Sequence, residues 1–159
     1  MMSPKKNSCR TVSKRGFTLV EIAFVVVIIG LLTILALPLV VRARDNARAA
    51  RFISDLRNAV QAFELYAIQT GYYPSDTAPG VRPPEMAEEL ERTLWDKPTP
   101  IGGSWDWSVD QGSYYAGVAV SGAVVPTSLL QAIDRRLDDG DLSSGMFQGS
   151  GGDVVYIIE

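Results

Sequence analysis

The first pattern along the chain is a long apolar run. Residues 22–41 carry no charge, and only Gly30, Thr33 and Pro38 interrupt an otherwise apolar stretch. As an α-helix these residues would extend about 30 Å, which is the thickness of the hydrocarbon core of a bilayer. Pro38 lacks an N–H, so we expect it to kink or loosen the helix locally. The pattern predicts a transmembrane helix over residues 17–41.

Helical periodicity continues beyond this run without a break. Apolar residues then recur at steps of three and four, at Ala49, Ile53, Leu56, Val60, Phe63 and Ala67. This spacing predicts an amphipathic helix to about Thr70, ended by Gly71 and kept from resuming by Pro74. The two segments together predict one helix of about 50 residues, apolar all round in its first half and apolar along one face in its second.

The rest of the chain alternates between turn signals and short ordered segments. In order, the patterns predict a loop at 72–84, a short helix at 85–94, strands at 103–109 and 113–120, an amphipathic helix at 126–137 and a last strand at 154–158. Residues 110–112 suit a hairpin turn between the first two strands. The predicted fold is therefore α+β, with a long N-terminal helix whose second half packs on a small antiparallel sheet.

Charge is distributed unevenly along the chain. Residues 1–16 carry +5 and the whole chain carries −3, so residues 17–159 carry −8. A domain of that sign is not expected to bind nucleic acid directly. The apolar run has an equally basic flank on its other side, so charge alone does not predict its orientation in a membrane. That second flank contains Arg42, Arg44, Arg48, Arg51 and Arg57, offset by Asp45 and Asp55.

Several kinds of chemistry are missing from the composition. There is no histidine, and the single cysteine, Cys9, lies in the basic N-terminal stretch. Histidine acid–base catalysis, Ser-His-Asp triads, ordinary zinc sites and an intrachain disulfide are therefore excluded. We therefore expect no enzymatic activity and no cofactor. A membrane-anchored enzyme is the less favoured alternative.

The apolar run has two simpler interpretations. A cleaved secretory signal peptide also has a basic start, but its apolar part is shorter, and no small-residue cleavage site precedes Arg42. An uncleaved signal anchor fits the length better. Neither interpretation explains Glu21, because an ionised carboxylate inside a membrane span costs roughly 2.5–3.5 kcal/mol on insertion scales.

The residues around Glu21 resemble the type IV pilin and type II secretion pseudopilin superfamily. A basic leader, residues 1–16, ends in KRG and is followed by FTLVE and an apolar helix with Gly30 and Pro38 at the family's usual positions. The resemblance implies that a prepilin peptidase cleaves the Gly16–Phe17 bond and methylates the new N-terminal Phe17. It also implies that the helix kinks or melts locally at Gly30 and Pro38. Beyond about residue 70 the match is weaker.

The same resemblance implies a function. The chain is expected to be a structural subunit of a type II secretion pseudopilus, a helical filament that promotes protein export. The alternative is a type IV pilus subunit for adhesion, motility or DNA uptake. Many type IV pilins hold their C-terminal region with a disulfide, and the mature chain here has no cysteine, which favours the pseudopilus.

Partners and location follow from the family in the same way. The expected partners are the prepilin peptidase, other copies and other (pseudo)pilins, the inner-membrane assembly platform, and membrane lipid before assembly. The chain is expected to cross the bacterial inner membrane once, with residues 42–159 as a globular domain in the periplasm, and then to enter the filament.

Glu21 has two possible roles. After cleavage it would lie four residues from the new terminus, about 6 Å along the helix, and the freed α-amino group is mostly cationic at neutral pH. The family implies that Glu21 pairs with the N-terminal amine of an adjacent subunit and sets the register of assembly. Alternatively, the carboxylate reaches the nearby interface or bonds its own helix terminus.

An acidic cluster near the C-terminus is a candidate calcium site. Asp138, Asp139 and Asp141 surround Gly140 and offer the oxygen ligands that calcium prefers. The family's major pseudopilins bind calcium in a C-terminal loop. However, the stretch DDGDLSSG is not an EF-hand loop, and an acid-rich helix end explains it equally well.

Two further motifs have a structural and a functional interpretation. Trp95, Trp105 and Trp107 suit either a carbohydrate-binding platform or the core of a small sheet, and the core is the better interpretation. The glycine-rich residues 148–152 lack the Lys-Ser/Thr pair of a phosphate loop, so they are interpreted as a flexible connector.

Overall fold

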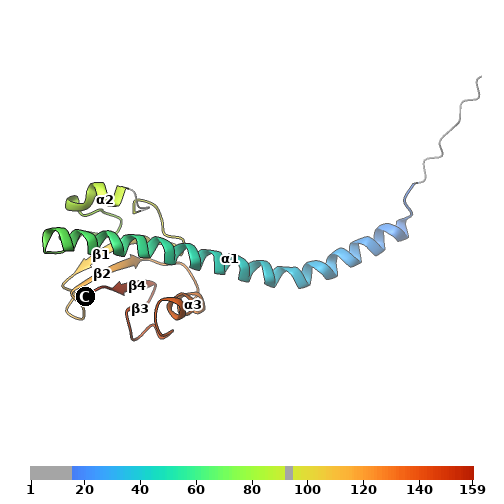
Figure 1. The fold of residues 1–159 in the computed structure, drawn as a ribbon. Helices are drawn as coiled ribbons and strands as arrows, with labels where there is room; N and C mark the ends of the chain where they lie inside the picture. Colours follow the sequence, from blue (N-terminus) through green and yellow to red (C-terminus); the bar gives the residue numbers. More distant parts are fainter. Residues whose placement is uncertain (1–15, 92–94) are drawn as a thin grey trace, which may run out of the picture. The chain divides into compact units, whose positions relative to one another are not determined.

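The computed structural model describes residues 16–91 and 95–159, with Glu91 and Ser150 described by their backbone only. Its elements are α1 (Leu19–Thr70), the 3₁₀ helix η1 (Pro84–Met86), α2 (Ala87–Glu91), β1 (Ser104–Val109), β2 (Ala116–Ser121), α3 (Thr127–Leu137), β3 (Phe147–Ser150) and β4 (Asp153–Ile157) (Figure 1). Two compact units are distinguished, with the boundary between Val41 and Arg42, and α1 contributes to both.

The first unit contains the apolar half of α1. Every described residue from 16 to 41 is exposed, and the chain is helical on both sides of Gly30 and Pro38. Among the described residues, α1 is the helix that is long and apolar enough to cross a membrane. A kink or local melting at Gly30 and Pro38 stays a prediction.

The second half of α1 buries one face in the second unit. Its buried residues are Ala49, Phe52, Ile53, Leu56, Ala59, Phe63 and Tyr66. The predicted face was therefore partly wrong, because Val60 and Ala67 are only half-buried. Phe52 was not predicted on this face, and its ring stacks on Trp105 with a centroid distance of 5.6 Å and an interplanar angle of 6°.

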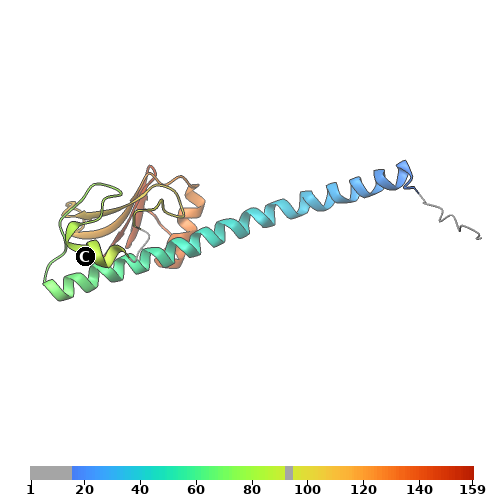
Figure 2. The same ribbon diagram turned by 90° about the horizontal axis from the view of Figure 1, so that it is seen from above.

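Four antiparallel strands form the sheet in the order β1-β2-β4-β3. Figures 1 and 2 show the second half of α1 along one face of this sheet, as the predicted fold requires. The interpretation of residues 148–152 as a flexible connector is wrong. Residues 148–150 belong to β3, which pairs with β4, and Gly151 and Gly152 form the turn with φ values of 64° and 100°.

The three tryptophans belong to the core, as predicted. Trp95, Trp105 and Trp107 are at most 2% exposed, so no ring face is available to a sugar. Two of their indole N–H groups hold the preceding loop in place: Trp107 Nε1 donates to the Pro74 carbonyl at 3.1 Å, and Trp95 Nε1 donates to the Val81 carbonyl at 3.2 Å. The predicted loop is thereby fixed on the aromatic core.

The smaller elements follow the predicted pattern with shifted bounds. The helix expected at 85–94 is divided into η1 and α2, which bury Met86 and Leu90, and residues 92–94 lie outside the described residues. The connection after β1 is longer than the predicted turn, so β2 begins at Ala116. In α3, Leu129, Leu130 and Ile133 are buried, Leu137 is half-buried, and Asp134 is buried as well.

Candidate functional site

The predicted cleavage site lies in an exposed segment before α1. Gly16 and Phe17 precede the first helical residue, and Phe17 is 82% exposed. A Cβ atom added at Gly16 would meet no atom within 4 Å. The Gly16–Phe17 bond therefore lies outside the helix, and its cleavage stays a prediction.

Glu21 forms a reciprocal cap with Thr18 at the start of α1. Its Oε2 atom accepts hydrogen bonds from the Thr18 backbone N–H and hydroxyl, both at 3.0 Å. In return, the Thr18 hydroxyl oxygen accepts a bond from the Glu21 N–H at 3.3 Å. This is a capping box, in which two helix-terminal N–H groups that would lack a partner are satisfied by side chains. Thr18 was not predicted as a site residue, although the Thr-x-x-Glu spacing of residues 18–21 is the sequence signature of a capping box.

The cap uses only part of the carboxylate. Among the described residues, no donor is recorded for Glu21 Oε1, and the Glu21 side chain is exposed. A carboxylate offers about four acceptor positions, so an oxygen stays available to a cation. The two roles considered for Glu21 are therefore compatible: it closes its own helix terminus and still presents negative charge outward.

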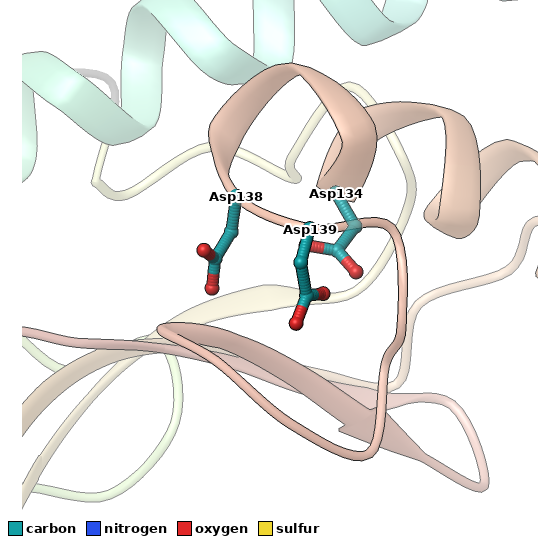
Figure 3. Close-up of side chains that lie close together, drawn as sticks. All are labelled: Asp134, Asp138 and Asp139. Carbon is teal, nitrogen blue, oxygen red and sulfur yellow. The ribbon is translucent and has the colours of Figure 1, made fainter.

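Three aspartates gather at the end of α3 (Figure 3). Asp134 lies in the helix, Asp138 is its C-cap, and Asp139 follows. Each offers a carboxylate oxygen, and these atoms lie within 4.8 Å of one another. Asp141 was predicted as a ligand but is not in this group. Its Oδ1 atom accepts bonds from the backbone N–H and hydroxyl of Ser143.

Asp134 was not predicted, because an aspartate in an amphipathic helix normally faces solvent. Its four-residue spacing from Asp138 is the signal that places both on one side of the helix. The side chain is 0% exposed, and neither carboxylate oxygen has a hydrogen-bond partner in the part of the chain that the structure describes. Burial, and then the charges of Asp139 and Asp138, raise the pKa of Asp134, while the nearby Gly140 N–H opposes this shift.

The group fits a calcium ion in distance and chemistry. Calcium binds oxygen ligands at about 2.3–2.6 Å, so two ligands of one ion lie no more than ~5 Å apart. The flanking loop already holds the exposed carboxylates: Asp138 accepts a bond from the Met146 N–H, and Asp139 accepts a bond from the Ser144 hydroxyl at 3.0 Å. Each of these two carboxylates has lone pairs left, and a cation would provide Asp134 with the partner it lacks.

The chain is similar in sequence to proteins named type II secretion system core protein G. It is 36% identical over 66 residues to the Klebsiella michiganensis protein, which is 42% of this chain and 46% of that one. It is 35% identical over 65 residues to the Escherichia coli protein and 38% identical over 60 residues to that of Pseudomonas aeruginosa. The matches span less than half the length of these relatives. No family model matches the chain.

A solved structure supports the fold. The major type IV pilin of Clostridium difficile superposes with a TM-score of 0.51 at 14% identity, over 71% of this chain and 95% of that one. Both comparisons confirm the predicted resemblance to the type IV pilin and pseudopilin superfamily, and the structure confirms the pilin-like α+β fold. These relatives bear the names of structural subunits rather than enzymes, in agreement with the prediction of a non-enzymatic protein.

Proposed function

We propose that the chain is a structural subunit of a type II secretion pseudopilus. The similarity to core protein G, at 35–38% identity in the three relatives above, is the observation that favours this function. In this proposal a prepilin peptidase removes residues 1–16 and methylates Phe17. The mature chain waits in the inner membrane through residues 17–41, with residues 42–159 in the periplasm. The assembly platform then moves it into a helical filament with other copies and related subunits.

Glu21 has the central role in the proposed assembly. In a filament core made of apolar helices, an unpaired carboxylate and an unpaired amine are both costly, and pairing them removes the cost only in the correct register. The cap with Thr18 orients the carboxylate toward the helix terminus, and one oxygen is left for the amine of a neighbouring Phe17. The pair would therefore select register rather than add much net stability.

Substitutions at Glu21 test the proposal. Glu21→Leu should be cleaved and should accumulate in the membrane at least as well as the parent chain, because it removes an insertion cost of a few kcal/mol. It should nevertheless yield no filaments, and Glu21→Gln should be reduced. The measurement is filament yield by shearing and electron microscopy, beside the membrane level of processed subunit. Normal filaments from Glu21→Leu would refute the pairing.

Thr18→Val is the matched control. It removes the hydroxyl that caps the helix but keeps the charge of Glu21, so filament yield should fall much less than in Glu21→Leu. If the two variants are equally defective, Glu21 acts only through its own helix terminus.

A type IV pilus subunit is the second candidate function, and the likeness to a solved major type IV pilin favours it. Genetic context separates the two. A neighbouring secretin and secretion ATPase without a retraction ATPase would support secretion, whereas a retraction ATPase would support adhesion, motility or DNA uptake.

We also propose that this chain binds calcium, through Asp134, Asp138 and Asp139. The buried carboxylate of Asp134, which lacks a hydrogen-bond partner among the described residues, supports this assignment. Bound calcium would offset two of the three negative charges and connect the end of α3 to the loop that precedes β3. The ion would have a structural role, because it would hold together two segments of the globular unit.

A further inference from the structure

A groove lined by tyrosines lies at the C-terminal end of α1. It has a volume of about 650 Å³, and its lining includes Tyr72, Tyr73 and Tyr115 together with the carboxylates of Glu64 and Glu159. Tyr72 is 60% exposed and Tyr115 is 50% exposed. No ion pair to either glutamate is formed within residues 16–91 and 95–159. We call this surface the tyrosine groove.

The chemistry of the groove selects a cation. Burial, and then the charges of Glu159 and Glu64, raise the pKa of the Tyr73 hydroxyl, so both carboxylates act on the same space. Aromatic faces attract cations, and a planar guanidinium can stack on a tyrosine ring while it pairs with a carboxylate. Arginine is therefore the side chain that matches the groove.

The same unit carries three arginines that form no ion pair among the described residues, although the charge of Arg51 acts on Asp55. Arg44, Arg48 and Arg51 are exposed and fall at steps of four and three, which places them along one side of α1. Among the described residues they form no ion pair, whereas Arg82 pairs with Asp96 at 3.1 Å. We call these three residues the basic stripe.

One chain cannot bring these two surfaces together. Arg48 and Glu64 are sixteen residues apart on α1, which corresponds to about 24 Å along the axis and about 160° around it. Two smaller hollows also place these residues on different sides of α1. Arg51 lines one together with the loop at 97–100, and Glu64 lines the other together with Tyr156. The complement of the groove must therefore come from another molecule.

We propose that the basic stripe of one copy docks in the tyrosine groove of the next copy. The inference rests on the proposed function as a filament subunit and adds a specific contact to it. The two surfaces differ and lie on opposite sides of α1, so the contact is heterologous and repeats as an open chain of copies rather than closing a dimer. Parallel copies joined in this way would be displaced by about 20–30 Å along α1, the axial distance from Glu64 to the three arginines.

Paired cysteines test the contact in the full chain, expressed with its peptidase and assembly platform. Arg48→Cys and Glu64→Cys are combined with Cys9→Ser, so that no other thiol is present. Filaments treated with a short bis-maleimide should then show a ladder of dimers, trimers and longer products, because the crosslinker spans an arginine–glutamate contact whose Cα atoms lie beyond the ~7 Å limit of a disulfide. Arg48 and Glu64 lie about 24 Å apart along α1, so the short crosslinker cannot join them inside one chain. Each single variant, and Arg48→Cys with Glu88→Cys on the exposed side of α2, should give no ladder.

A charge exchange tests the chemistry. Glu64→Arg and Arg48→Glu should each lower filament yield about tenfold, which corresponds to ~1.4 kcal/mol. The double variant restores opposite charges at every contact and should regain most of the yield. Glu88→Arg makes the same charge change on α2, outside the groove, and should have little effect.

The outcomes separate this contact from the proposed function. Filaments of the parent chain combined with no ladder from the cysteine pair would overturn the contact and leave the function intact. Arg48→Glu could lower filament yield while Glu64→Arg alone has no effect and the double variant regains nothing. That result would assign the arginines to another surface, such as lipid headgroups, and would also overturn the contact. If the parent chain is never processed or assembled, the proposed function fails, and the contact fails with it.

Discussion

The ring of Phe63 lies flat against the indole of Trp107, with a centroid distance of 3.8 Å and an interplanar angle of 6°. Both side chains are 0% exposed, so α1 and β1 meet there without solvent. Phe63→Ala should lower the free energy of unfolding of residues 42–159 by about 3–5 kcal/mol, because it removes a buried ring and leaves a cavity. Urea unfolding measures the change.

The matched control lies two residues further along the helix. Leu65 is 53% exposed, and Leu65→Ala should change the free energy of unfolding by less than about 0.5 kcal/mol. Equal losses from both variants would mean that α1 is not held to the sheet by this aromatic contact.

Asp106 should make the second unit less stable as pH rises. Burial, followed by the charge of Asp76, raises the pKa of Asp106 to about 6, and its Oδ1 atom has no hydrogen-bond partner among the described residues. The folded state then holds a proton that the unfolded state releases at lower pH. The contribution is present below about pH 4 and is lost as pH rises through about 6.

Asp106→Asn removes this titration. At pH 7.5 it should stabilise residues 42–159 by an amount on the order of 1 kcal/mol, a value reduced for the partial exposure of the side chain. Thermal unfolding in EDTA between pH 4 and 8 gives the comparison. The same substitution at the exposed Asp110, which follows β1, is the control and should leave the free energy of unfolding nearly unchanged at pH 7.5. An unchanged slope in Asp106→Asn would contradict the prediction.

Calcium should stabilise the same unit. At a calcium concentration of about 100 times Kd, binding to the folded state adds ~2.7 kcal/mol to the free energy of unfolding, and EDTA should reverse the gain. Asp134→Asn should abolish this response. It should also stabilise the metal-free protein, because a buried negative charge is removed.

Asp141→Asn serves as the control, since Asp141 lies outside the three-aspartate group. It should keep the calcium response, measured by thermal unfolding and isothermal titration. No response in the parent protein, or a response that survives Asp134→Asn, would remove these residues as the calcium site.

Processing should depend on Gly16. Co-expression with a prepilin peptidase should shorten the chain by residues 1–16 and add one methyl group to Phe17, whereas Gly16→Leu should block the cut because a bulky side chain would occupy the cleavage position. Mass spectrometry of the mature protein decides between them. Gly30→Leu lies inside α1 and should leave cleavage intact. A native start at Met1, or a cut beyond Val41, would contradict the assignment.

Periodic segments of the fold could be predicted from sequence. The long helix, β1 and α3 each repeat apolar residues at the spacing of their element, so local pattern and final structure agree. β3 could not be predicted in this way. Its residues 147–150 include glycine and glutamine, which have little strand preference, and the strand is formed by pairing with β4.

The candidate sites also differ in whether a local sequence pattern or the tertiary packing determines them. The cleavage bond and Glu21 depend on neighbours within a few residues, so a short motif contains the information. The three-aspartate group depends on the burial of Asp134, which the packing of α3 produces and no local pattern reports. The tyrosine groove joins residues from three distant parts of the chain and becomes visible only when the sheet positions Tyr115 beside the end of α1.

The place of β4 also constrains when folding can finish. It is the last strand along the chain, yet it lies between β2 and β3 and is the neighbour to which β3 is hydrogen-bonded. A ribosome delivers residues 153–157 after all other strands, so a growing polypeptide cannot assemble this sheet early. Until residues 153–157 have been synthesised, β2 and β3 lack the strand that lies between them, and the sheet stays incomplete.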